Sequence, residues 1–176
     1  VDVLSPHSLE EALRLKAERP DAVPIAGGTD VMVALNFDRL RPPALLNLNE
    51  VPELRGWSRE NGTLRLGAGL TYAEAMQEPL AELLPALAEA SRTVGSPQIR
   101  NRGTIGGNIC SNDPTNHLPP LLVALGATMT IAGADGERTV SAEEFFVGVF
   151  ETTVRPGELL ARITIPASGG AGDGFA

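Results

Sequence analysis

Two glycine-rich stretches constrain the fold of this chain more than any other feature. They read Ala26-Gly-Gly-Thr-Asp30 and Thr104-Ile-Gly-Gly-Asn108. Each follows a predicted β-strand, over residues 22–26 and 98–104. Paired glycines let a backbone come close to a ligand, and successive amides in such a turn can bind an anion. Two such turns, far apart in sequence, predict a large ligand that carries two phosphates and is held at two points.

Hydrophobic spacing and turn residues predict a mixed α+β chain. Capping boxes are expected at Ser8, Thr71 and Ser141, each with a glutamate three residues later. Asn61-Gly62 predicts a hairpin turn, and Pro85 predicts a break in a helical segment. A boundary between two lobes is expected near residue 55. The predicted strands cover residues 22–26, 45–48, 57–59, 63–67, 98–104, 127–132, 138–140 and 159–165, and the predicted helices follow Ser8 and cover residues 30–35, 80–94 and 118–125.

The charge balance of the 176-residue chain argues against a nucleic-acid surface, because the net charge is −8 and Lys16 is the only lysine. Backbone amides and helix N-termini would therefore have to hold a pyrophosphate. Cys110 is the only cysteine, so neither an internal disulfide nor an iron–sulfur cluster on this chain is expected. No apolar run of about 18 residues and no signal peptide is evident. A cytoplasmic protein without membrane insertion is the expectation.

Four stretches carry a family resemblance through nearly the whole chain. They are Pro24-Ile-Ala-Gly-Gly-Thr-Asp-Val-Met-Val33, Leu66-Gly-Ala-Gly-Leu-Thr-Tyr-Ala-Glu74, Gln98-Ile-Arg-Asn-Arg-Gly-Thr-Ile-Gly-Gly-Asn-Ile109 and Pro119-Pro-Leu-Leu-Val-Ala-Leu-Gly-Ala127. With them the chain resembles the FAD-binding (medium) subunit of the molybdenum hydroxylases, the family of carbon monoxide dehydrogenase and xanthine dehydrogenase. The resemblance implies an α+β, two-lobed FAD-binding fold of the PCMH/vanillyl-alcohol-oxidase type. A small lobe at 1–55 and a larger mixed lobe at 56–176 are expected, and the family's C-terminal domain is expected to be absent.

The resemblance also implies two main groups of FAD-binding residues. The first wraps the pyrophosphate and comprises Ile25, Ala26, Gly27, Gly28, Thr29, Asp30 and Val31. Asp30 is expected to cap a helix, because a carboxylate facing phosphate would repel it. The second group contacts the diphosphate and ribityl region and comprises Gly103, Thr104, Gly107 and Asn108. Each group also has an explanation without a ligand. The first could be a tight strand-to-helix turn, and Asn108 of the second could occupy a left-handed turn position.

Six further residues are implied to lie near the cofactor. Val94 and Gly95 would lie near the flavin ring, and Leu159 or Leu160 would pack on it, although core packing explains all four equally well. Cys110 would make a small contact, or act as a buried apolar residue. His117 would bond the adenosine portion where many relatives carry an aspartate, and a plain helix-start residue explains it as well.

The implied function is electron transfer through a non-covalently bound FAD. The expected partners are a large subunit with a molybdenum cofactor and a small subunit with [2Fe–2S] clusters. No catalytic side chain and no metal site is predicted on this chain, since the cofactor supplies the electron chemistry. Two alternatives stay open: a self-contained flavin reductase or oxidase resembling the enolpyruvyl-sugar reductase, and an assembly module without a cofactor. FAD titration and a pyridine-nucleotide oxidation assay would separate the three.

Overall fold

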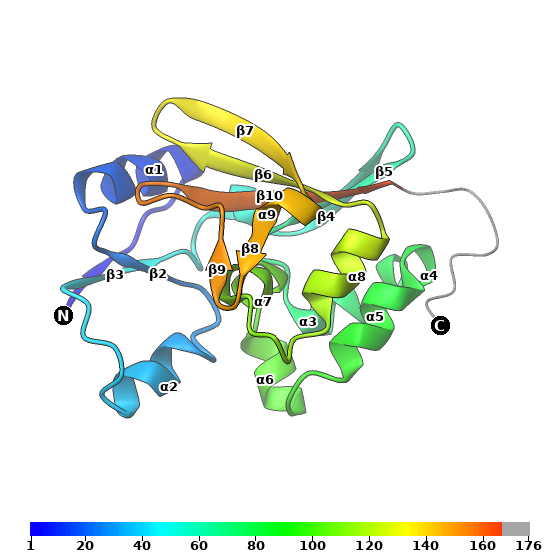
Figure 1. Ribbon diagram of the computed structural model, residues 1–176, viewed down its shortest axis with the longest axis horizontal. Helices are drawn as coiled ribbons and strands as arrows, with labels where there is room; N and C mark the ends of the chain where they lie inside the picture. Colours follow the sequence, from blue (N-terminus) through cyan, green and yellow to red (C-terminus); the bar gives the residue numbers. More distant parts are fainter. Residues whose placement is uncertain (167–176) are drawn as a thin grey trace.

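The computed structural model describes residues 1–166 and contains three β-sheets (Figure 1). A small parallel sheet near the N-terminus has the strand order β1-β3-β2. A five-stranded antiparallel sheet has the order β4-β5-β10-β6-β7, and β8 and β9 form a separate pair. The strands are β1 (Asp2–Leu4), β2 (Val23–Ile25), β3 (Ala44–Asn47), β4 (Trp57–Glu60), β5 (Thr63–Gly67), β6 (Thr128–Gly133), β7 (Gly136–Ser141), β8 (Phe146–Gly148), β9 (Glu151–Thr152) and β10 (Leu159–Pro166).

Short helices surround the sheets, and most of them gather below the five-stranded sheet in Figure 1. They are α1 (Leu9–Glu18), α2 (Val31–Asn36), the 3-10 turn η1 (Pro52–Leu54), α3 (Tyr72–Ala75), α4 (Leu80–Leu83), α5 (Pro85–Arg92), α6 (Pro97–Arg102), α7 (Ile105–Ser111), α8 (Leu118–Ala124) and α9 (Ala142–Phe145). The mixed α+β class is as predicted. The helix break at Pro85 and the hairpin between β4 and β5 are also present. Residues 167–176 lie outside the part of the chain that the structure describes.

Local capping explains where several helices begin. Thr71 with Glu74 and Ser141 with Glu144 form complete capping boxes. Ser8 also accepts a hydrogen bond from the Glu11 amide at 3.1 Å. The Glu11 carboxylate, however, accepts from the amide of His7 at 2.9 Å, so the predicted box there is only half formed.

The strand predicted over residues 98–104 is wrong. This segment contains α6, which begins at Pro97 after Ser96, whose hydroxyl accepts from the Ile99 amide at 3.3 Å. A serine cap followed by proline at the first helical position favours a helix. Thr104 then caps the next helix, α7. The second glycine stretch is therefore the first turn of a helix, and not a loop after a strand.

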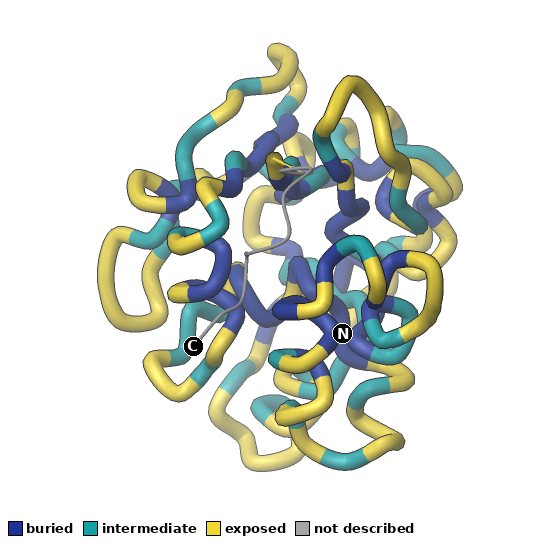
Figure 2. Tube along the Cα trace, turned by 90° about the vertical axis from the view of Figure 1, so that its right-hand side faces the viewer, coloured by how far each residue is buried: buried dark blue, intermediate teal, exposed yellow. Residues whose placement is uncertain are grey.

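The two lobes share apolar packing. The larger core lies under the five-stranded sheet, where its fully buried side chains include Leu66, Ile105 and Phe145. The smaller core joins Ala12 and Leu46 of the N-terminal lobe to the sheet residues Ala132, Leu159 and Ala161. Buried stretches accordingly run through the interior of Figure 2, with exposed loops outside. The lobe boundary near residue 55 falls between η1 and β4 and stays a prediction, but the lobes do not have separate cores.

The first glycine turn packs directly on the backbone of the larger lobe. A Cβ atom at Gly27 would lie 2.0 Å from the carbonyl oxygen of Arg102 and 2.9 Å from the amide nitrogen of Gly103. Gly106 is similarly tight, because its Cβ would lie 2.5 Å from the carbonyl oxygen of Ala68. Glycine is thus required at both positions for packing, independently of any ligand.

We expect Gly27→Ala to destabilise the protein by about 1–3 kcal/mol, because the added methyl group meets rigid backbone. Urea unfolding measures the change in free energy. Gly148→Ala is the matched control, since its Cβ would only meet the Glu151 carboxylate at 3.6 Å. Equal unfolding free energies for the two variants would contradict the packing role of Gly27.

Candidate functional site

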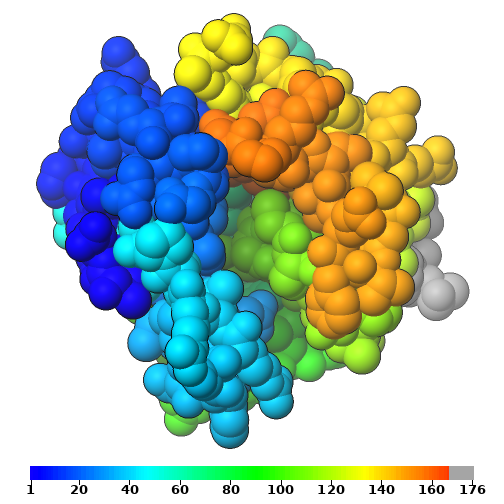
Figure 3. Space-filling model, turned by 60° about the vertical axis from the view of Figure 1, so that its left-hand side comes forward, coloured from blue at the N-terminus to red at the C-terminus, as the bar shows by residue number. Residues whose placement is uncertain are grey.

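A cavity of about 380 Å³ opens where the two glycine stretches meet. In Figure 3 it is the hollow between the N-terminal residues, in blue and cyan, and the segment in orange, with green residues on its floor. Its volume is in the range of small-molecule sites, about 300–1,000 Å³. The wall contains Pro24, Ala26, Gly27, Gly28, Thr29, Asp30, Val31, Leu48, Asn49, Leu54, Arg55, Ala68, Gly69, Tyr72, Thr104, Gly106, Gly107, Asn108, Cys110, Ser111, Thr152, Val154, Glu158, Leu159 and Leu160.

The first glycine turn contributes a run of unused backbone donors to this cavity. The amides of residues 27–31 make no hydrogen bond to another described residue. Strand β2 ends at Ile25, and helix α2 begins only at Val31, so neither element uses these amides. Gly28 turns the chain with φ +76°. Consecutive free amides before a helix are the arrangement that binds phosphate groups.

Asp30 precedes α2 without capping it through its side chain. Its backbone is in the αR region, and its carboxylate accepts no capping hydrogen bond. The expected capping role of this carboxylate is therefore wrong. The residue nevertheless lies on the cavity wall.

The second glycine stretch has no run of spare amides, because the amides of residues 105–108 all donate hydrogen bonds within the protein. The Ile105 and Gly106 amides donate to the carbonyl oxygens of Leu70 and Ala68, both at 2.8 Å. The Gly107 amide donates to the Thr104 hydroxyl at 3.0 Å, and the Asn108 amide donates to the Thr104 carbonyl at 3.1 Å. A second backbone nest, as the sequence predicts, is thus not present. These bonds fix the start of α7 against the segment before α3.

Asn108 instead brings an unused side-chain acceptor. The residue is only 6% exposed, and its Oδ1 has no hydrogen-bond partner in the described part of the chain. A buried polar atom without a partner is costly, so a ligand donor would be stabilised there. Tyr72 lies on the same wall. Burial raises the pKa of its phenol to about 12, and the polar side chain of Asn108 opposes part of that rise.

Charged groups on the cavity wall are few. Arg55 is the one cation among the lining residues, and its Nη2 atom lies 3.5 Å from a carboxylate oxygen of Glu74. Asp30 and Glu158 bring negative charge. Glu158 is neutralised by a forked pair with Arg138, and this hydrogen-bonded guanidinium lowers the pKa of the Glu158 carboxyl.

Cys110 has an exposed thiol that lines the cavity. The protein atoms packed around it disfavour the thiolate and raise its pKa to about 12. The sulfur is therefore a neutral thiol at physiological pH. This protonation state argues against a nucleophilic or redox role.

The structure brings together twelve of the seventeen residues expected to bind the cofactor. They are Ala26, Gly27, Gly28, Thr29, Asp30, Val31, Thr104, Gly107, Asn108, Cys110, Leu159 and Leu160. Their contact with a ligand stays a prediction. Of these twelve, Leu159 and Leu160 are also buried core residues, in agreement with the alternative of core packing.

The other five expected residues do not line the cavity. Ile25 is the last residue of β2, and Gly103 lies under the ring of Tyr72. Val94 packs against the larger core, and Gly95 lies against Ile99. The His117 ring is exposed, and its Nδ1 lies 3.1 Å from the Thr93 hydroxyl. Their ligand roles remain predictions without support from the cavity.

Several lining residues were missed at the sequence level. Gly106 and Tyr72 stood inside the matching stretches and could have been named from them. No sequence pattern marked Asn49, Arg55 and Glu158 as site residues, because segments far apart in the chain bring them to the cavity wall. Asn49 is held there by its side-chain amide, which donates to the Ala26 carbonyl at 2.9 Å.

Neither a metal centre nor a membrane span is found in the described residues. No group of three or more histidine, cysteine, aspartate or glutamate side chains is placed to hold a metal ion in residues 1–166. Within the same residues, no helix combines the length and apolar character needed to cross a membrane.

The donor set fits a dinucleotide such as FAD. Five consecutive free amides suit the two charges of a diphosphate without needing a lysine. The buried Oδ1 atom of Asn108 suits an N–H or O–H donor of the same ligand. Apolar side chains such as Leu48, Val154 and Leu160 give the remaining wall the character of a cofactor site.

Comparison with known proteins places this chain in a family. Residues 1–168 match the model described as the FAD binding domain in molybdopterin dehydrogenase. The chain is 39% identical over 168 residues to the caffeine dehydrogenase subunit beta of Pseudomonas sp. (strain CBB1), covering 94% of this chain and 57% of that protein. It is 36% identical to the carbon monoxide dehydrogenase medium chain of Hydrogenophaga pseudoflava, covering 93% of this chain and 58% of that protein.

A solved structure agrees in fold. The crystal structure of quinoline 2-oxidoreductase from Pseudomonas putida 86 superposes with a TM-score of 0.92 at 37% identity, covering 96% of this chain and 59% of that one. The predicted fold class is thereby confirmed. The chain spans somewhat under 60% of the length of each of these three proteins. It belongs to the family of FAD binding domains in molybdopterin dehydrogenases, and FAD is its cofactor.

Proposed function

We propose that this chain is the FAD-binding part of an electron-transfer subunit in a molybdenum-containing hydroxylase or dehydrogenase. Its partners would be a large subunit with the molybdenum cofactor and a small subunit with [2Fe–2S] clusters. The relatives named as a dehydrogenase subunit beta and a dehydrogenase medium chain support this assignment. The single cysteine also supports it, because this chain cannot ligate such clusters itself.

The free amides of residues 27–31 are the observation that carries the proposal. They are held in place before a ligand arrives, because Gly27 packs on the backbone of Arg102 and Gly103. Preorganised amides avoid the cost of ordering a loop on binding. They would hold the diphosphate, and Asn108 would accept one hydrogen bond from the cofactor. Because few charged groups line the wall, these hydrogen bonds from neutral groups would contribute most of the polar binding of the cofactor.

The chain's residues would orient the cofactor, and the reaction chemistry would come from FAD. When bound, FAD supplies a centre that takes up electrons from the iron–sulfur clusters and passes them to an external acceptor. Leu159 and Leu160 lie on the wall and are anchored in the buried sheet, so they would fix one side of the site. The neutral Cys110 thiol would pack beside the cofactor and hold its proton.

We expect Gly107→Asp to weaken FAD binding about tenfold relative to Gly107→Asn, since a carboxylate on the wall would repel the diphosphate by about 1–2 kcal/mol. The two side chains have almost the same shape, so the comparison isolates the charge. A Cβ at Gly107 meets only the Thr104 hydroxyl, at 3.0 Å. FAD titration followed by flavin fluorescence gives both dissociation constants.

The salt dependence of this difference is an internal control. Screening should shrink the gap between the Asp and Asn variants as ionic strength rises. Identical affinities at low salt would show that the diphosphate does not lie near α7. Absence of FAD binding by the unaltered protein would overturn the proposed function itself.

We expect Cys110 to react more slowly than a free thiol with iodoacetamide at pH 8, because its raised pKa leaves less of the reactive thiolate. Saturating FAD should slow the reaction further by covering the cavity wall. Mass spectrometry of the alkylated protein measures both rates, with free glutathione as the reference thiol. Reaction as fast as glutathione, unaffected by FAD, would place this thiol outside the cofactor site.

A further inference from the structure

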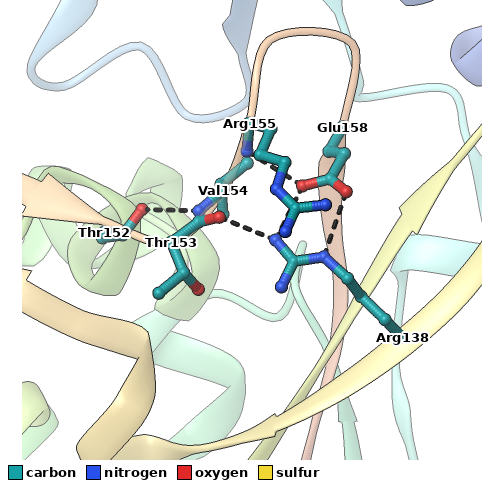
Figure 4. Close-up of polar contacts among 6 residues, drawn as sticks. All are labelled: Arg138, Thr152, Thr153, Val154, Arg155 and Glu158. Atoms are coloured by element: carbon teal, nitrogen blue, oxygen red, sulfur yellow. Dashed lines mark hydrogen bonds and ion pairs between the residues drawn. The ribbon is translucent and has the colours of Figure 1, made fainter.

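Arg138 donates three side-chain hydrogen bonds, two to Glu158 and one to the Thr153 carbonyl (Figure 4). Its Nε donates to Glu158 Oε1 at 3.0 Å, and its Nη2 donates to Oε2 at 2.8 Å. The same Nη2 donates to the carbonyl oxygen of Thr153 at 2.7 Å. The Arg155 amide adds a fourth bond, to Glu158 Oε2 at 2.9 Å. We call this group the clasp.

The clasp ties one wall of the cavity to the five-stranded sheet. Arg138 lies on β7, whereas its partners lie in the segment that joins β9 to β10. With Thr152 at the end of β9 it forms the segment of residues 152–158, of which Thr152, Val154 and Glu158 line the cavity. Arg138 does not line the cavity, so it can affect a ligand only through the segment that it holds.

The ion pair between Arg138 and Glu158 is partly shielded from solvent. The side chains of Arg138 and Glu158 are 28% and 16% exposed. A two-point arginine–carboxylate pair fixes geometry as well as charge. The segment has other anchors as well: the Thr153 amide donates to the Phe145 carbonyl at 3.0 Å, and Val154 packs against the larger core. Neither involves Glu158, so loss of the guanidinium would loosen the part of the segment around Glu158 and leave this carboxylate without its arginine on the cavity wall.

Resting on the proposed function, we infer that Arg138 is a positioning residue for FAD. It holds the segment of residues 152–158 so that this wall is already formed opposite the free amides of residues 27–31. It also neutralises Glu158, which would otherwise present an unpaired negative charge to an anionic cofactor.

The chain offers a matched control for this inference. Arg162 and Glu137 form a second forked pair, with bonds of 3.3 and 2.8 Å between β10 and β7 of the same sheet. Their side chains are 34% and 46% exposed. Neither residue lines the cavity. Removing this pair removes a similar interaction from the same sheet without touching the segment.

The experiment compares Arg138→Met with Arg162→Met in the full chain. In metal sites, loss of a residue that orients the ligating side chains lowers affinity or activity about 10- to 100-fold. By analogy, we expect FAD binding to weaken about tenfold in Arg138→Met. Arg162→Met should change the dissociation constant less than about twofold. The visible circular dichroism of bound FAD should change only in Arg138→Met, since this signal reports the surroundings of the flavin. Denaturant unfolding of the FAD-free variants separates binding from stability.

Glu158→Gln tests whether Arg138 acts through Glu158. The double variant with Arg138→Met should then bind FAD no more weakly than Arg138→Met alone, because both changes open the same clasp. Fully additive losses, or equal FAD affinity in Arg138→Met and Arg162→Met, would overturn the inference while leaving the proposed function intact. An unaltered protein that binds no FAD would overturn both.

Discussion

The contact between Gly27 and the backbone of Arg102 and Gly103 is the constraint on which the cavity depends. A side chain at Gly27 would collide with a carbonyl group, which cannot move without disturbing both α6 and α7. The first glycine turn is therefore pressed against the larger lobe, and its unpaired amides lie at the junction of the lobes. A looser junction would not hold donors and acceptors from both lobes around one ligand.

The two glycine stretches have different physical roles despite their similar sequences. Residues 27–31 leave their amides free and so can bind an anion. In α7 Gly106 serves close packing, and the amides of residues 105–108 are consumed by Thr104, Leu70 and Ala68. The second stretch contributes through the buried Asn108 side chain. One stretch thus offers donors and the other an acceptor, which matches a ligand with phosphates at one place and an N–H or O–H group at another.

Rigidity is built into the site from three directions. The smaller core joins α1 and the parallel sheet to residues of β6 and β10. The clasp ties the segment of residues 152–158 to β7. Hydrogen bonds from α7 to the segment before α3 fix the floor of the cavity. A site formed in advance costs little ordering on binding.

The sequence by itself determined the local features of this protein. Asn61-Gly62 specified the hairpin because both residues adopt positive φ there, and Thr71 with Glu74 specified a helix start through bonds only three residues apart. The glycine-rich stretches and the family resemblance indicated the cofactor and twelve residues of its cavity. Tertiary structure alone decided which amides stay free and that Arg138 and Glu158 meet. Those outcomes depend on partners 20 to 75 residues away in the chain, whose positions no local pattern encodes.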